Sequence, residues 1–299
     1  GVYLGTYQIS DQVDVRPHRV NVVEQDFPLT ETSDISGGYL LEVDGFRDGN
    51  CFATSYYGVP IRIHRPDDDE IVAKQTAWIN DYVNQFEWAL ISGDYTDEYK
   101  GYRRFVDSTS LANWYIATEV SANVDGFYST YFYKDQNAPL LYWGPLWDYD
   151  IAYNNDYRTD RGGSNTTRQL MVNVAYNGSK VWVQRMWTDP WFARLVYRRY
   201  QKALSDGLVD FLHQKIDSVA KLLDASQKLN YRKWGIDTRM YHEIVLYSSY
   251  KEYVNDLKQF VSDHTEFLSS AFAAKQPNGP VTPDTPSDAT PPFVAENYY

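Results

Sequence analysis

Two acidic segments on either side of an expected hairpin constrain this chain more than any other feature of its sequence. The first segment is NVD at residues 123–125, and the second is GPLWDYD at residues 144–150. Between them, residues 126–134 are rich in aromatic side chains and are typical of a strand, and residues 140–143 are typical of a second, shorter strand. The predicted unit is therefore a helix end, an aspartate, a hairpin and a second aspartate.

This arrangement suits phosphoryl transfer. That reaction needs one carboxylate to orient or deprotonate the attacking hydroxyl and a second to hold the metal ion that bridges the nucleotide phosphates, and kinases place the two acids on either side of such a hairpin. Two other interpretations stay open. Aspartate and asparagine also cap helices and stabilise turns. A glycosidase needs only a pair of carboxylates, and Asp125 and Asp148 would then act as acid and nucleophile.

The remaining pattern predicts an α+β protein. Short β-branched and aromatic runs separated by Gly and Asp indicate an antiparallel sheet, at residues 2–9, 18–24, 37–44 and 60–64. Apolar residues at helical spacing indicate helices, at residues 71–91, 110–121, 190–204, 207–224 and 251–272. The acidic run at residues 67–70 is interpreted as the cap of the first helix and Asp107 as a candidate cap of the second.

Several polar residues in these elements have two interpretations. Glu42 and Asp44 lie two positions apart and so face the same side of a strand, which makes them either a wall of a nucleotide cleft or a solvated strand face. The polar stretch at residues 154–178 resembles a substrate-binding loop. It contains Arg158, Arg161 and Arg168, which are either contacts for phosphate or an acidic substrate, or solvated charges.

Composition argues against two classes of partner. The chain has 40 acidic and 28 basic residues and a formal charge of −12, whereas nucleic acid and anionic membrane surfaces both require a basic face. No apolar run approaches the length of a membrane span. Cys51 is the single cysteine, so no intrachain disulfide forms, and it is expected to be a small buried residue.

A series of short stretches follows an order that is typical of one family. They are GTY at 5–7, SDQ at 10–12, RVNV at 19–22, SGGYLLEVD at 36–44, PIRIHRP at 60–66, FVD at 105–107, NVDG at 123–126, WDYD at 147–150 and WTDPWF at 187–192. In this ordered set the chain, from residue 1 to about 272, resembles the CotH kinase family, an atypical kinase-like domain named after a bacterial spore coat protein. The resemblance is to the form found in secreted Bacteroidetes proteins.

The resemblance implies a two-lobed α+β fold like that of protein kinases, with an antiparallel N-terminal sheet and a mostly helical C-terminal lobe. It implies ATP and Mg²⁺ or Mn²⁺ as cofactors, and transfer of the γ-phosphoryl group to a protein hydroxyl. The implied site residues are Asp125 as the catalytic residue, Asp148, Asp150 and Asn123 as metal ligands, and Asp11 and Glu42 as contacts of the nucleotide.

The resemblance also implies how the chain is organised. A kinase-like domain is expected at residues 1–274, with the N-lobe at about 1–66 and the C-lobe at about 67–274, followed by a Pro/Thr-rich linker or tail at 275–299. The chain is expected to begin within the N-terminal sheet, after the strands that carry the phosphate-binding lysine. An extracytoplasmic location and a protein substrate or surface partner are implied.

The alternative function is a catalytically inactive kinase-like module of a cell-surface protein that binds protein or carbohydrate. Three features favour it: the upstream strands are expected to be missing, Asp11 stands where the family usually has Glu, and the chain is rich in aromatic residues.

Overall fold

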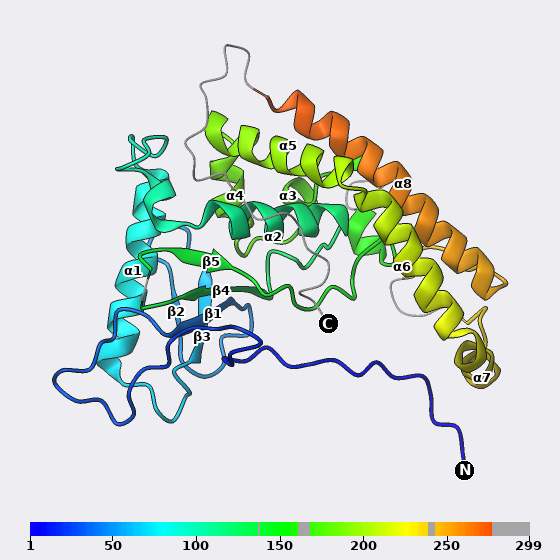
Figure 1. The fold of residues 1–299 in the computed structure, drawn as a ribbon, viewed down its shortest axis with the longest axis horizontal. Coiled ribbons are helices and arrows are strands. Elements are labelled where there is room, and N and C mark those ends of the chain that lie inside the picture. The colour runs from blue at the N-terminus through cyan, green and yellow to red at the C-terminus, as the bar shows by residue number, and fades with distance from the viewer. Residues whose placement is uncertain (137, 161–167, 239–242, 277–299) are drawn as a thin grey trace.

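An antiparallel sheet and a set of helices on one side of it form the chain (Figure 1). The computed structural model describes residues 1–136, 138–160, 168–238 and 243–276. The sheet has five strands in the order β2-β3-β1-β4-β5, and every neighbouring pair is antiparallel. Its strands are β1 (Tyr39–Val43), β2 (Cys51–Ala53), β3 (Pro60–Arg65), β4 (Thr130–Lys134) and β5 (Leu141–Trp143). The expected hairpin is β4-β5, and the predicted α+β kinase-like class is confirmed.

Among the helices of the described residues, α2 (Ser108–Val120) contacts β5, α3, α5 and α8. The others are α1 (Ala73–Ile91), α3 (Met171–Val174), α4 (Lys180–Met186), α5 (Pro190–Ser205), α6 (Leu208–Leu222), α7 (Asp224–Trp234) and α8 (Tyr250–Ala274), with short 3-10 turns η1 (Tyr102–Phe105) and η2 (Tyr157–Asp160). The five predicted helices are confirmed to within a few residues, whereas α3, α4 and α7 were not predicted; α3 lies in the stretch interpreted as a loop. Within the described part of the chain, no helix has the length and apolar character needed to cross a bilayer.

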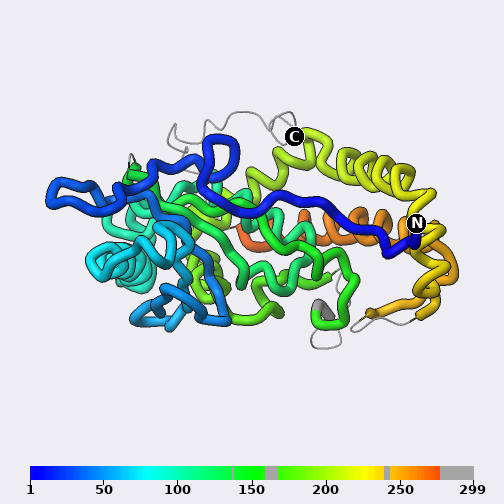
Figure 2. The backbone as a smooth tube through the Cα atoms, turned by 90° about the horizontal axis from the view of Figure 1, so that it is seen from below, coloured from blue at the N-terminus to red at the C-terminus, as the bar shows by residue number. Residues whose placement is uncertain are grey.

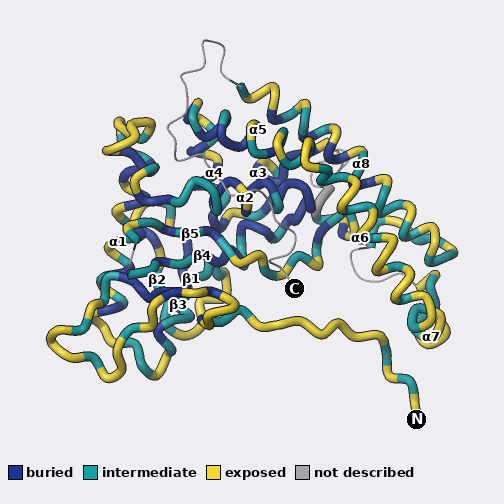
Figure 3. Tube along the Cα trace, viewed as in Figure 1, coloured by how far each residue is buried: buried dark blue, intermediate teal, exposed yellow. Residues whose placement is uncertain are grey.

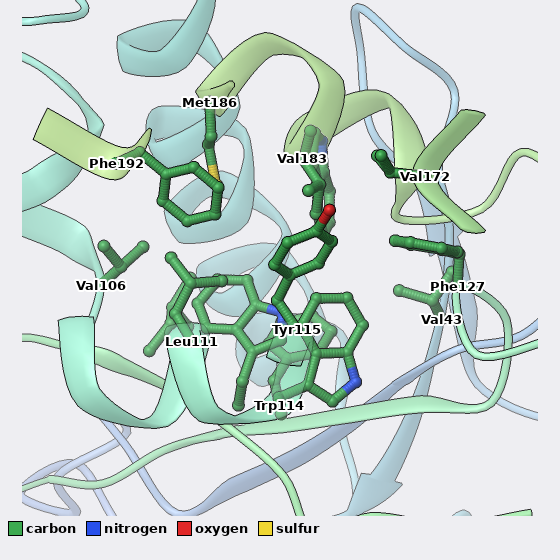
Figure 4. Close-up of a cluster of buried hydrophobic side chains, with 14 of the residues drawn as sticks. Val43, Val106, Leu111, Trp114, Tyr115, Phe127, Val172, Val183, Met186 and Phe192 are labelled. Atoms are coloured by element: carbon green, nitrogen blue, oxygen red, sulfur yellow. The ribbon is translucent and has the colours of Figure 1, made fainter. Parts of the chain in front are cut away.

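A single large core joins the sheet to the helices. Buried residues of this core come from β1, α1, α2, β4 and α8, among them Leu41, Phe86, Phe132 and Phe272. Figure 3 shows the buried residues gathered between the sheet and α2, and Figure 4 shows Tyr115 of α2 within this cluster. Because β4 and β5 join the same sheet as β1, strands from both sides of the expected boundary at residue 66 share this core. The division into lobes at that point stays a prediction.

The other face of the sheet carries a smaller cluster beneath the N-terminal segment. Val15, Val20 and Val22 of that segment pack with Leu40 of β1 and Tyr131 of β4, and Trp147 packs against them. From there the segment continues away from the sheet to α7 (Figures 1 and 2). The two faces therefore differ, since one meets the helical core and the other is covered only in part.

The strands predicted at residues 2–9 and 18–24 are wrong. Residues 2–9 have no strand beside them; instead the Tyr3 hydroxyl donates to Ser226 O (3.2 Å) and the Thr6 amide donates to Asn230 Oδ1 (3.4 Å), both on α7. Around residue 20 the chain turns back on itself and forms only an isolated bridge between Val15 and Val20. Strand propensity is present in both segments, but a strand needs a neighbour with which to pair.

The Gly37-Gly38 pair marks a close approach of backbones, as its position before β1 indicates. A Cβ atom on Gly37 would lie 2.1 Å from Gln136 N, and one on Gly38, whose φ is +85°, would lie 2.4 Å from Val23 O. Since both neighbours are main-chain atoms, neither contact is relieved by a side-chain rotation.

The two predicted helix caps have different outcomes. Asp107 caps α2, because its Oδ1 accepts from the Ser110 amide at 2.7 Å. The acidic run at 67–70 does not cap α1, which begins at Ala73, with Gln75 Oε1 accepting from the Val72 amide at 2.7 Å. Asp68 in that run instead forms an ion pair with Arg62 on β3.

Candidate active site

The first acidic segment forms a tight loop directly after α2. Asn123 is fully buried, and its Oδ1 accepts from the Asp125 amide at 2.9 Å. The Asp125 carbonyl accepts from the Tyr128 amide at 2.8 Å, which continues the turn towards β4. The Asp125 side chain is half-buried. The main chain of residue 125 is thus fixed on both sides, and its carboxylate extends from a rigid loop.

The second acidic segment follows β5 and presents two acids in an alternating pattern. Asp148 and Asp150 are exposed, whereas Tyr149 between them turns inward, and its hydroxyl lies 2.8 Å from the Thr118 hydroxyl of α2. Asp148 has φ of +60°, a left-handed conformation that aspartate tolerates better than most residues. Tyr149 therefore fixes the segment to the helix that precedes Asp125.

Asn123 connects the two segments directly. Its Nδ2 donates to the Asp148 carbonyl at 3.2 Å, while its Oδ1 receives the Asp125 amide. Both ends of this buried amide are therefore bonded to main-chain groups, one in each loop. Asn123 sets the distance between the loops, and its predicted role as a metal ligand stays a prediction.

The acidic side chains of the site repel one another. The pKa of Asp148 is raised, first by loss of solvent and then by the neighbouring charges of Asp150, Asp125 and Glu42. Because like charges add to the effect of lost solvent on a carboxyl pKa, Asp150, Asp125 and Glu42 all lie within electrostatic range of Asp148. A divalent cation in this neighbourhood would relieve their repulsion.

Glu42 reaches the site from the partly covered face of the sheet. It pairs in register with Tyr131 on β4 and with Arg62 on β3, so their side chains share that face. Glu42 Oε2 lies 2.7 Å from His64 Nε2, and the Tyr131 hydroxyl lies 3.4 Å from the same nitrogen. Glu42 therefore belongs to a polar group on the sheet, close enough to Asp148 to affect its titration.

Asp11 belongs to the N-terminal segment, and its contacts with Arg19 and Gln12 lie within that segment. It is exposed and forms an ion pair with Arg19, and its Oδ1 accepts from the Gln12 amide at 3.1 Å. These contacts hold a local turn. The predicted contact of Asp11 with the nucleotide stays a prediction.

The sequence matches the CotH kinase protein family across residues 1–268. The chain belongs to this family. The match includes both acidic segments, the whole sheet and most of α8, and it identifies an atypical kinase-like domain. No curated protein matches the chain.

A CotH kinase-like domain implies a divalent metal, and the residues present suit one. Carboxylate oxygens are the ligands preferred by Mg²⁺ and Mn²⁺. Within the described ranges, no three or more His, Cys, Asp or Glu side chains converge to form a metal site. Mg²⁺ needs no such cage, since it usually binds through one or two carboxylates together with water and substrate phosphates. Asp148 and Asp150 offer such a pair.

Glu119 supports the site and was missed by the sequence analysis. It is fully buried on α2, and its two carboxylate oxygens accept from the Met171 amide (2.7 Å) and the Val172 amide (2.9 Å). Its carbonyl lies 2.6 Å from His264 Nε2 on α8. Glu119 thus joins α2, α3 and α8 just before Asn123. The sequence signal that could have indicated a buried, structural role for Glu119 was the presence of an acid in a largely apolar helix.

The stability of the protein should depend on pH through Glu119. Burial raises the pKa of Glu119 from 4.5 to about 7, although hydrogen bonds from the two amides oppose the shift. Between these values the folded chain keeps a proton that the unfolded chain releases, so the free energy of unfolding falls as pH rises from 4.5 to about 7 and then levels. Glutamine does not titrate, so Glu119→Gln should lack this fall in the free energy of unfolding. Urea unfolding of both proteins at several pH values measures the free energy of unfolding. A constant difference between the two proteins across this window would contradict the expectation.

Proposed function

We propose that this domain is an ATP-dependent atypical protein kinase, which transfers the γ-phosphoryl group of ATP to a protein hydroxyl with Mg²⁺ or Mn²⁺. The observation that carries the proposal is that Asn123 joins the Asp125 loop to the Asp148 loop across the hairpin, and the charges of Asp150, Asp125 and Glu42 act on Asp148 there. Membership of the CotH kinase family supports the class of reaction. By resemblance to secreted members, we propose an extracytoplasmic location and a surface protein as substrate or partner.

Each residue then has a defined task. Asp125, on its rigid loop, orients or deprotonates the acceptor hydroxyl. Asp148 and Asp150 hold the metal, which when bound neutralises charge on the phosphates. Asn123 and Tyr149 keep the two loops at a fixed separation. Glu42 contacts the nucleotide from the sheet in this proposal.

Replacing Asp148 by asparagine tests the metal role. Asparagine tolerates the left-handed backbone at this position, and loss of one negative charge relieves repulsion, so the fold should be unaffected or slightly stabilised. Loss of residues that merely orient metal ligands costs about 10- to 100-fold in affinity, so loss of a ligand should lower the affinity for Mn²⁺-ATP at least tenfold. Calorimetric titration of Mn²⁺ and ATP measures this.

The matched control is Asp69→Asn, which removes an exposed aspartate far from the hairpin in sequence. It should bind Mn²⁺-ATP as the wild type does. Unchanged affinity in Asp148→Asn, or a loss of stability above about 1 kcal/mol with binding retained, would make Asp148 a structural residue.

A binding module without catalysis is the second candidate, and exposed aromatic rings favour it. Trp88 and Tyr56 are 53% and 57% exposed, and their ring centroids lie 5.8 Å apart. Such rings suit contact with carbohydrate or protein. Absence of any Mn²⁺-ATP affinity in the wild type would favour this function over the kinase.

A further inference from the structure

An acidic site that accepts ATP needs a cation to meet the phosphates. The basic residues of the sheet are engaged elsewhere. Lys134 Nζ donates to three carbonyl groups, those of Ser36, Asp135 and Ala138, at 2.7 to 2.9 Å. Arg62 binds Asp68. These contacts hold the cations in structural roles.

The chain after Asp150 folds back towards the end of α2. Asn155 Nδ2 donates to the Asp150 carbonyl at 2.6 Å, and Asn155 Oδ1 accepts from the Ala152 amide at 3.0 Å. The Tyr153 amide donates to the Ser121 carbonyl at 2.5 Å, two residues before Asn123. This turn brings residues 156–158 back beside the acidic loops.

Asp156 holds Arg158 in a fixed orientation there. Asp156 is 6% exposed, and its Oδ1 accepts from both the Arg158 amide and the Arg158 Nε at 2.8 Å. Its Oδ2 accepts from Arg158 Nη2 at 2.7 Å. The pair is therefore bidentate along one edge of the guanidinium group, which gives it directional as well as electrostatic strength.

Arg158 also lies within electrostatic reach of Asp125. The pKa of Arg158 is raised, first by its hydrogen bonds with Asp156 and further by the charges of Asp156 and Asp125. The positive charge of Arg158 is therefore within interaction range of the carboxylate of the proposed catalytic residue.

We propose that Arg158 binds the terminal phosphates of the nucleotide beside Asp125, and that Asp156 is its positioning residue. The inference rests on the proposed kinase function. A guanidinium group keeps its charge at any working pH and presents paired N–H donors that match phosphate oxygens. Asp156 anchors one edge of the group, and the contacts of Tyr153 and Asn155 return the chain to the acidic loops just before it.

Calorimetry with ATP and AMP, each with Mn²⁺, tests the inference. Arg158→Gln should weaken Mn²⁺-ATP binding at least about tenfold, since it removes charge-assisted bonds to phosphate, and should leave AMP affinity within about twofold. Arg158→Lys should bind Mn²⁺-ATP more tightly than Arg158→Gln does but less tightly than the wild type. Lysine keeps the positive charge but lacks the paired N–H donors of the guanidinium group. Asp156→Asn should give an intermediate loss. Lys228→Gln, which removes an exposed cation on α7, is the control and should match the wild type.

Each outcome decides a separate point. If the wild type binds ATP and Arg158→Gln binds it equally well, the inference on Arg158 is wrong and the kinase function stands. Equal losses for ATP and AMP would also overturn it, because the contact would not be with the terminal phosphates. If the wild type itself binds no Mn²⁺-ATP, both the proposed function and the inference fail. Circular dichroism of each variant, with Arg158→Lys as the conservative change, separates these results from misfolding.

Discussion

Replacing Glu119 by alanine should destabilise the fold by about 3 kcal/mol or more, the largest effect expected of any single substitution considered for this domain. The change leaves the buried amides of Met171 and Val172 without their acceptors, and each unsatisfied buried group costs about 1 to 3 kcal/mol. It also leaves a cavity in the core beside α8. Urea unfolding at neutral pH measures the difference in free energy.

Glu266→Ala is the matched control. Glu266 lies on α8, is exposed, and should change the free energy of unfolding by less than about 0.5 kcal/mol. If Glu119→Ala were as stable as this control, the two amides would have to find other partners, and Glu119 would not be the link between α2 and α3.

The sequence predicts the elements of this fold better than their pairing. Residues 37–44 and 60–64 became β1 and β3, but residues 2–9 have the same β-branched and aromatic character and form no strand. Propensity acts locally, whereas strand formation requires a partner that the rest of the fold supplies. For the same reason, the insertion of β4 beside β1 does not follow from either segment alone.

In the candidate site, too, the sequence predicts the order of the elements better than the contacts between them. The positions of Asp125 before β4 and Asp148 after β5 follow from the order of elements and are as predicted. The approach of Glu42 depends on the register between β1 and β4, and the link through Asn123 depends on how two loops fold. β1 and β4 are far apart in the sequence and share no turn, so neither their pairing nor the loop contacts can be predicted from a local pattern. The residues that set the site's geometry were therefore harder to predict than those that carry its charge.

Asp125→Ala should lower phosphoryl transfer at least about 100-fold, the loss expected when a positioned general base is removed. The bonds that shape its loop use main-chain atoms, since Asn123 Oδ1 accepts from the residue 125 amide and the residue 125 carbonyl accepts from the Tyr128 amide. Alanine keeps both. The loop should therefore persist, and the loss should appear in the rate of transfer while Mn²⁺-ATP affinity stays within a few fold of the wild type.

Incubation with labelled ATP, Mn²⁺ and a panel of surface proteins measures this effect, with Asp94→Ala, an exposed aspartate in the turn after α1, as the control. Transfer by the wild type and the control, with almost none by Asp125→Ala, is the expected result. Equal labelling by all three proteins would remove Asp125 from the mechanism. Labelling by none of them, together with normal ATP binding in all, would place the domain among nucleotide-binding modules, because an intact acidic pair would then be insufficient for transfer.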